Sequence, residues 1–171
     1  MIYLPKRAVF IHIPRTGGNS VTSAIAGVCV GRGIDTILGT GAGVKNWRPV
    51  SRHVRAATLK EIIAEWDNIY KFAVNRPMGE RVKSVARLIE RDIENNIHKD
   101  PTCPEGWKSV LKNEDENYWK SFMRQTTDWY TKGNNKESLG VEIYEMSEIN
   151  DKWYEICEKC DIPQCSLPRL N

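Results

Sequence analysis

Residues 8–20 read Ala-Val-Phe-Ile-His-Ile-Pro-Arg-Thr-Gly-Gly-Asn-Ser, and the architecture of the chain follows from them outward. The apolar run over residues 8–13 is typical of a short buried strand. A proline and two adjacent glycines interrupt it, and Asn19 and Ser20 are residue types that commonly begin helices. Apolar side chains at helical spacing follow over residues 21–28. The stretch therefore predicts a strand, a glycine turn and a helix in direct succession.

The alternation of strands and helices continues along the chain. Residues 69–74 predict a second strand and residues 141–144 a third. Helices are predicted from Thr58 to Trp66, along the apolar stripe from Val82 to Ile97, and from Ile149 to Cys157. Strands alternating with helices are typical of an α/β fold with a parallel sheet, and the length suits one domain over residues 1–171.

Less regular segments join these elements. Residues 29–50 contain five glycines and predict a long connection, or a loop with a short strand. Residues 107–111 and 118–123 predict short helices. Ligands of α/β sheets bind beyond the carboxyl ends of the strands, so we expect residues 14–20 and 75–84 at the same edge.

The net charge of +3 hides a separation of charge along the chain. Residues 1–91 carry 15 basic and 6 acidic side chains, whereas residues 92–171 carry 10 basic and 16 acidic ones. Such a cationic first half indicates a binding site for a polyanion.

Composition excludes several classes of protein. A hydrophobic share of 40% with 27% charged residues is typical of a globular domain. No apolar run approaches the roughly 20 residues of a membrane span, and residues 1–7 lack the pattern of a signal peptide. The five cysteines cannot all pair within the chain, so we expect a reducing, cytoplasmic setting with free thiols. A zinc site at Cys157, Cys160 and Cys165 is the weaker alternative, because no fourth ligand is evident nearby.

The turn at residues 14–20 has the chemistry of an anion site. Glycines let backbone N–H groups approach an anion, and the following helix adds free N–H groups and the positive end of its dipole. Arg15, Thr16, Asn19 and Ser20 supply side-chain donors. The Gly-x-x-x-x-Gly-Lys-Ser/Thr loop of nucleoside triphosphatases is absent. The alternative is a plain glycine turn between a strand and a helix.

Arg76, Arg81 and Ser84 form a second candidate site after the second strand. Arg81 and Ser84 are three residues apart and share one face of a helix, and Arg76 at the strand end can reach the same space. Two guanidinium groups and a hydroxyl suit a terminal phosphate monoester. The alternative is a solvated basic helix, which the neighbouring Lys83 and Arg87 also fit.

Together the two stretches resemble the sulfotransferases. Residues 10–20 are similar to the sulfate-donor loop of the carbohydrate-type members, usually H-I-P-K-T-G-G-T-S, and residues 72–84 are similar to the family's 3'-phosphate segment, usually V-R-N-P-x-x-R-x-x-S. Weaker similarities cover most of the chain. The resemblance implies an α/β fold of the P-loop NTPase-like kind, with three layers and a short, mostly parallel central sheet flanked by helices.

The resemblance also assigns residues to both ends of the donor, 3'-phosphoadenosine 5'-phosphosulfate (PAPS), and implies no metal. The 5'-phosphosulfate would be held by Arg15, Thr16, Gly17, Gly18, Asn19 and Ser20, and the 3'-phosphate by Arg76, Arg81 and Ser84. Arg15 stands where the family usually has lysine, and its cation would also act in catalysis by neutralising charge on the departing phosphate. Pro77 directly follows Arg76, where the family usually has one residue between them.

Sulfuryl transfer to a hydroxyl or amine needs a base, and His53 is the candidate. It matches the family's histidine-bearing segment and lies between Arg52 and Arg55, whose charges favour a neutral ring.

Arg48, Arg52 and Arg55 are candidates for binding an anionic acceptor such as a sugar acid or a sulfated glycan, and the alternative is a solvated basic loop. We expect a structural role for His12, a role for Glu145 in organising the last helix, and mostly core positions for Trp107, Trp119, Trp129 and Trp153.

The sequence therefore predicts a sulfotransferase for a small-molecule or glycan acceptor, with neither nucleic acid nor membrane as a partner. One alternative is a kinase-like P-loop phosphotransferase, which the missing Lys-Ser/Thr pair disfavours. Another is a non-enzymatic protein that binds an anionic ligand, which is disfavoured because aromatic residues are not interleaved with the basic ones.

Overall fold

The computed structural model describes residues 1–39, 52–94 and 126–168. Arg48, Cys103 and the short helices expected at residues 107–111 and 118–123 lie outside these residues. The chain divides into two compact units. The first, called the sheet unit below, consists of Met1–Arg76 and Thr127–Asn171, and the second consists of Pro77–Thr126. The prediction of a single domain over residues 1–171 stays a prediction.

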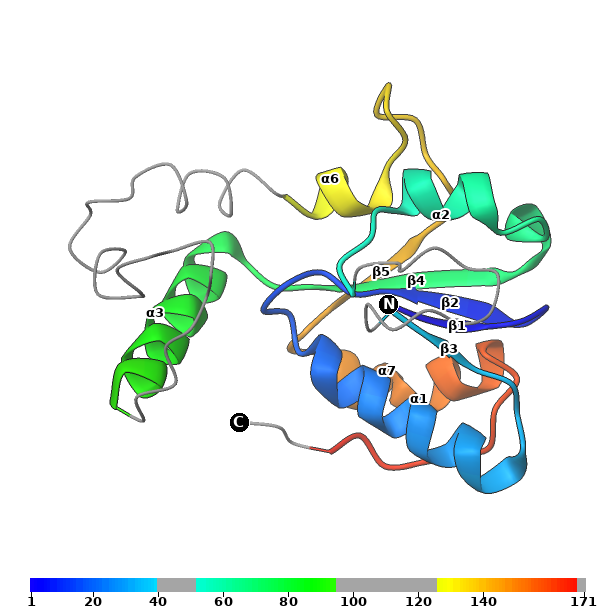
Figure 1. Cartoon of the computed structure of the whole chain (residues 1–171), viewed down its shortest axis with the longest axis horizontal. Coiled ribbons are helices and arrows are strands. Elements are labelled where there is room, and N and C mark those ends of the chain that lie inside the picture. Colours follow the sequence, from blue (N-terminus) through cyan, green and yellow to red (C-terminus); the bar gives the residue numbers. More distant parts are fainter. Residues whose placement is uncertain (40–51, 95–125, 169–171) are drawn as a thin grey trace. The chain divides into compact units, whose positions relative to one another are not determined.

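The sheet unit contains all the described strands and the helices that pack on them (Figure 1). Its elements are, in order, β1 Ile2–Leu4, β2 Ala8–Ile11, α1 Gly18–Arg32, β3 Ile37–Leu38, α2 Ala56–Ile62, the 3-10 helix η1 Trp66–Asn68, β4 Tyr70–Asn75, α6 Thr127–Thr131, β5 Glu142–Glu145 and α7 Ile149–Lys159. These elements confirm the expected α/β class. The strands near residues 69–74 and 141–144 lie within one residue of their predicted positions. The helix after the glycine turn is present as predicted, but it extends to Arg32, four residues beyond the predicted apolar pattern.

The sheet is mixed and not purely parallel, because one strand, β1, runs against the other four. Its strand order is β3-β1-β2-β4-β5, with β2, β4 and β5 parallel and β1 antiparallel to both of its neighbours. The cause is a tight turn that folds β1 back onto β2. Lys6 has a φ of 61° after Pro5, and the amide of Arg7 donates to the carbonyl of Leu4 at 3.0 Å, as in a type II turn.

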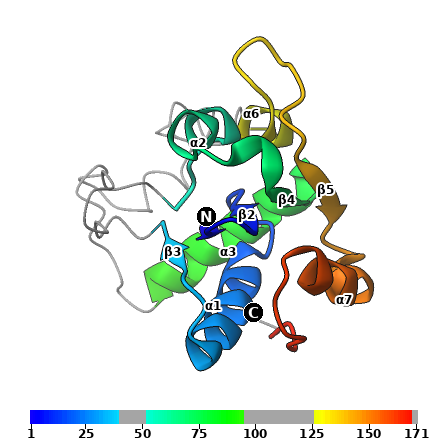
Figure 2. The same cartoon turned by 90° about the vertical axis from the view of Figure 1, so that its right-hand side faces the viewer.

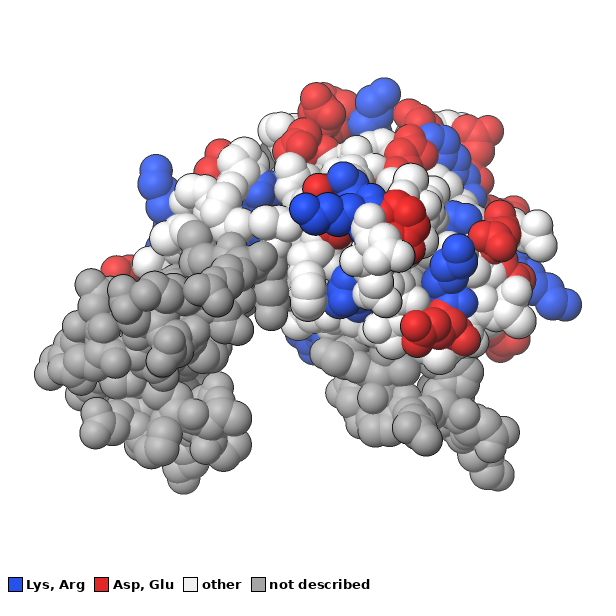
Figure 3. Space-filling view, turned by 90° about the horizontal axis from the view of Figure 1, so that it is seen from above, with Lys and Arg blue, Asp and Glu red and all other residues white. Residues whose placement is uncertain are grey.

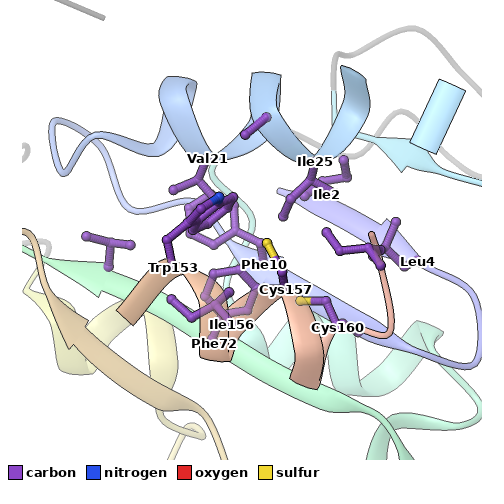
Figure 4. Packing of buried hydrophobic residues seen from close by; sticks show 14 of the residues in the cluster. Ile2, Leu4, Phe10, Val21, Ile25, Phe72, Trp153, Ile156, Cys157 and Cys160 are labelled. Atoms are coloured by element: carbon purple, nitrogen blue, oxygen red, sulfur yellow. The ribbon is translucent and has the colours of Figure 1, made fainter. Parts of the chain in front are cut away.

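Side chains alternate along the strands and feed two hydrophobic clusters, one on each face of the sheet. Ala8 and Phe10 of β2 belong to the cluster beneath α1 and α7, whereas Val9 and Ile11 belong to the cluster beneath α2. In Figure 1 and Figure 2, α1 and α7 cover one face of the sheet, and α2 and α6 cover the other. Figure 4 shows the first cluster, in which the rings of Phe10 and Phe72 lie 5.0 Å apart.

The topology fixes where a ligand could bind. Because β2, β4 and β5 are parallel, their carboxyl ends lie along one edge of the sheet. The loop into α1 follows β2 there, Arg76 follows β4, and Met146 follows β5. This edge is called the rim below, and it is the place where α/β sheets bind ligands.

The described part of the second unit is helix α3, Met78–Glu94. Val85, from the expected apolar stripe, is buried, as is Arg81. None of the described helices has the length and apolar character needed to cross a membrane.

Candidate functional site

The loop between β2 and α1 makes a sharp turn. Arg15 and Gly17 both have positive φ angles, 65° and 79°, and such an angle is uncommon for a residue other than glycine. The hydroxyl of Thr16 donates to the carbonyl oxygen of Ile13 at 2.9 Å, and the Thr16 side chain is fully buried. The hydroxyl therefore braces the turn, so what Thr16 can offer an anion is its backbone N–H.

The start of α1 has the features of an anion site. Gly17 is the N-cap residue, so no side-chain hydrogen bond caps the helix, and the first turn contains no acidic residue. The first N–H groups of a helix have no partner within the helix, and the helix dipole is positive at this end. The N–H groups of Gly18 and Asn19 belong to this first turn. The arrangement suits a phosphate or sulfate group.

His12 packs directly against the start of α1. Its ring is buried, and a Cβ added to Gly18 would lie 2.1 Å from its Cδ2 atom, far inside contact distance. Only glycine therefore allows the helix to begin this close to β2. Burial lowers the pKa of His12 to about 3, with His53 and nearby cations adding to the effect, so the ring is neutral. These contacts are in keeping with the structural role expected for His12.

His53 is held beside the same loop by the backbone of His12. Its Nδ1 lies 2.9 Å from the carbonyl oxygen of His12, and the two rings meet edge to face with centroids 4.6 Å apart. A carbonyl oxygen can only accept, so Nδ1 carries the hydrogen and the lone pair of the neutral ring is on Nε2. A ring nitrogen without a hydrogen, as at Nε2, is the form that a general base needs.

The pKa of His53 is lowered, which favours the neutral ring, as expected. The cause differs from the expected one, because burial contributes most and the charge of Arg52 contributes less. The hydrogen bond to His12 works in the opposite direction and raises the pKa.

Arg52 and His53 connect the segment before α2 to the loop between β2 and α1. Nη1 of Arg52 lies 3.4 Å from Oδ1 of Asn19, and the carbonyl of Arg52 accepts a hydrogen bond from the amine of Met1. The structure thus brings together two stretches that the sequence singled out separately, residues 14–20 and residues 52–55.

Arg55 is stacked on Trp129 of α6. Its guanidinium carbon lies 3.9 Å from the centre of the indole ring, and its Nε donates to the carbonyl oxygen of Trp129 at 2.9 Å. Within the described part of the chain, the hydrogen bonds of Arg55 use Nε alone, so the two terminal amino groups are available to a ligand. Trp129 is 47% exposed, and the expectation that it lies in the core is wrong, whereas Trp153 is buried as expected.

A network of hydrogen bonds joins the ends of β4 and β5 at the rim. Nδ2 of Asn75 donates to Oε1 of Glu145 at 2.8 Å, and the hydroxyl of Thr127 donates to Oδ1 of Asn75. The Met146 side chain lies 3.5 Å from the position that a Cβ of Gly17 would take. The side-chain carboxylate of Glu145 thus orients Asn75. The backbone carbonyl of Glu145 accepts a hydrogen bond from the amide of Glu148 at 3.0 Å, just before α7 begins.

Sequence reasoning placed residues 75–84 at this edge but assigned no role there to Asn75, Thr127 or Met146. A signal was available for Asn75 alone, because it ends a predicted strand and immediately precedes Arg76. Thr127 and Met146 reach the rim only through the packing of α6 and β5.

The remaining residues of the predicted phosphate site lie on two different units. Arg76 follows β4 in the sheet unit, whereas Arg81 and Ser84 lie on α3. Arg81 is buried, so a solvated basic helix does not describe this side chain, although Lys83 and Arg87 are exposed.

Charge is mixed on the face of the sheet unit shown in Figure 3. Lys and Arg side chains are interspersed there with Asp and Glu, and neither sign forms a continuous patch. Among residues 1–39, 52–94 and 126–168, no group of three His, Cys, Asp or Glu side chains is arranged to hold a metal ion.

No family model, curated protein or solved structure matches this chain.

Proposed function

We propose that the protein is a sulfotransferase that moves a sulfuryl group from PAPS to a hydroxyl or amine acceptor, on a P-loop NTPase-like fold. One observation carries the proposal. A helix N-terminus with neither a side-chain cap nor an acidic residue lies near a neutral histidine, His53, whose Nδ1 is held by the carbonyl of His12, so that Nε2 is the ring nitrogen without a hydrogen. This arrangement supports the proposal because it would set a general base beside an anion site.

The residues of the loop fit the donor's 5'-phosphosulfate. The N–H groups of Thr16, Gly17, Gly18 and Asn19, the hydroxyl of Ser20 and the cation of Arg15 would hold it. Arg76, at the end of the neighbouring parallel strand, would hold the 3'-phosphate, with Arg81 and Ser84 assigned from the resemblance alone. The donor has two anionic groups, which would account for a cation after β2 and another after β4.

When bound, the donor supplies the sulfuryl group and a phosphate that gains negative charge. Nε2 of His53 takes the proton of the acceptor hydroxyl or amine, and Nδ1 remains bound to the carbonyl of His12. Arg15 and the first-turn N–H groups stabilise the charge that develops on the phosphate side. The hydrogen bond that holds the His53 ring supports its assignment as the base.

Arg55 suits the acceptor. Its guanidinium is held flat by Trp129 and anchored through Nε, two residues from the base. The two terminal amino groups form a fork that matches an oxyanion. Arg52 and Arg48 would add positive charge around a small-molecule or glycan acceptor in the cytoplasm.

The test is a thermal-shift titration of the whole chain with 3',5'-adenosine diphosphate, the product of the donor, compared with ATP and Mg²⁺. A ligand that binds only the folded state stabilises it by about 2.7 kcal/mol at a hundred times its Kd. We expect the midpoint to rise with the 3'-phosphorylated nucleotide and to change little with ATP and Mg²⁺. A rise with ATP and Mg²⁺ alone would favour a phosphotransferase and contradict the proposal.

A further inference from the structure

Cysteines gather at one place in the hydrophobic cluster under α1 and α7. Cys29 lies on α1, Cys157 lies on α7, Cys160 directly follows α7 as its C-cap, and all three are buried in this cluster. Cys165, on the segment after α7, packs against the cluster and is half-buried. All four thiols are free, and Figure 4 shows Cys157 and Cys160 among the packed side chains.

The backbone after α7 turns back along the helix and brings Cys165 to Cys157. The turn uses Asp161, whose φ is 51°, and the amide of Ile162 donates to the carbonyl of Cys157 at 3.1 Å. The indole Nε1 of Trp153 then donates to the carbonyl of Cys165 at 2.8 Å. Two hydrogen bonds thus hold the returning segment in register with the helix.

We propose that Cys157 and Cys165 are a disulfide-forming pair, oxidised by a low-molecular-weight disulfide, and that the bond fastens residues 162–168 to α7. Their Sγ atoms already lie 4.0 Å apart. A disulfide needs about 2.05 Å, so the sulfurs approach by about 2 Å through side-chain rotation on backbones that are already held. The proposal is independent of the proposed sulfotransferase activity.

Burial decides the order in which the two thiols react. Cys165 is the partly exposed member, whereas Cys157 is buried. Burial beside Cys165 raises the pKa of Cys157 to about 11, which keeps its thiol protonated near neutral pH. Cys165 therefore meets the oxidant first and Cys157 resolves the intermediate.

With oxidised glutathione the reaction is balanced in two exchanges. The thiolate of Cys165 attacks one sulfur of glutathione disulfide, which forms a mixed disulfide and releases one reduced glutathione. Cys157 then gives its proton to solvent, attacks the sulfur of Cys165 and releases the second glutathione. Two protein thiols are oxidised to a disulfide, and one glutathione disulfide is reduced to two thiols.

The test is peptide mapping of the folded full chain after incubation with oxidised glutathione, acid quenching and alkylation. Trypsin separates residues 153–159, which contain Cys157, from residues 160–169, which contain both Cys160 and Cys165. The Cys160→Ser variant leaves Cys165 as the sole cysteine in its peptide, and Cys103→Ser in the same chain removes the remaining cysteine outside the cluster. We expect the peptides 153–159 and 160–169 to be joined, with a mass that is lower by two hydrogen atoms than the sum of the two peptide masses.

Two further variants make the result decisive. Cys165→Ser should abolish the joined peptide, whereas Cys29→Ser should leave it unchanged. Because burial keeps Cys157 protonated, the joined product should form faster at pH 9 than at pH 7. A glutathione adduct that persists on Cys165 while Cys157 is alkylated would overturn the proposal, and so would a link that forms only in denaturant.

Discussion

Nδ1 of His53 lies 2.9 Å from the carbonyl oxygen of His12, a residue 41 positions earlier in the chain. This contact connects the segment before α2 to the strand that leads into the glycine turn. It decides that Nδ1 carries the hydrogen of the neutral ring and that Nε2 does not. The position of the candidate base is thus set by a backbone atom, which no side-chain substitution at residue 12 removes.

The stability of the fold should fall in mild acid because of His12. Its pKa is about 3 in the folded protein against about 6.5 when unfolded, so below pH 6.5 the unfolded chain binds the additional proton. Stability is fully present above pH 6.5 and is lost as pH falls, by about 2 kcal/mol between pH 6.5 and pH 5 for this group. Urea unfolding at the two pH values measures it. The His12→Asn variant should lose less over the same range, and an equal loss would contradict the assignment.

Gly18→Ala should destabilise the protein because the new methyl group would overlap the ring of His12. Overpacking of this kind costs about 1–3 kcal/mol in the free energy of unfolding. Gly27→Ala is a matched control on the same helix, because a Cβ there meets nothing within 4 Å. It should be neutral or stabilising by up to about 1 kcal/mol. Chemical denaturation of both variants gives the comparison, and similar effects for the two would refute the argument.

His53→Ala should separate donor binding from transfer. If His53 is the base, the rate of sulfuryl transfer should fall by about 10²–10⁴-fold, the usual contribution of a general base. The thermal shift with 3',5'-adenosine diphosphate should persist, because the anion site belongs to the loop at the start of α1. Transfer assayed with labelled PAPS measures the first effect. Full activity in the variant would remove the base assignment and leave the donor site untouched.

Arg76→Ala should abolish the thermal shift with 3',5'-adenosine diphosphate, because the guanidinium after β4 would hold the 3'-phosphate. Lys60→Ala is the matched control, since Lys60 is an exposed cation of the same unit on α2. An equal loss of the shift in both variants would point to general charge attraction rather than a defined phosphate site.

Arg55 and Trp129 should be energetically coupled. Stacking of a guanidinium on an exposed indole contributes about 0.5–1 kcal/mol, so a double-mutant cycle with Arg55→Ala and Trp129→Ala should show a coupling of that size. Urea denaturation of the four proteins measures it. The cycle of Arg55→Ala with Tyr154→Ala, an exposed aromatic residue on α7, should be additive. Coupling in both cycles would contradict a specific contact.

The sequence predicted those parts of the fold that depend on local pattern. The apolar run from Ala8 and the glycines at positions 17 and 18 were sufficient to predict strand, turn and helix. Strand β1 was not expected, because three residues carry too short a pattern, and with it the antiparallel part of the sheet was missed. Helix α6 has only five residues, so Trp129 could not be placed on the surface from its neighbours.

The candidate site was predictable by residue type but not by arrangement. His53 could be chosen as a base from its segment, but its contact with His12 depends on tertiary packing across 41 positions. The same limit explains the pKa of His53, since flanking arginines are visible in a sequence whereas burial is not. Asn75 and Glu145 pair because β4 and β5 are neighbours in register, which only the sheet topology reveals.

The left-handed backbone of Arg15 allows the effect of backbone conformation at residue 15 to be considered apart from the effect of its side chain. At a φ of 65° a side chain costs roughly 1–2 kcal/mol, while glycine would lose about 0.5–1 kcal/mol through its greater freedom when unfolded. The two effects nearly cancel, so backbone conformation alone gives little preference between arginine and glycine at this position. The identity of residue 15 therefore depends on what its side chain contacts and on the positive charge that it brings to the rim.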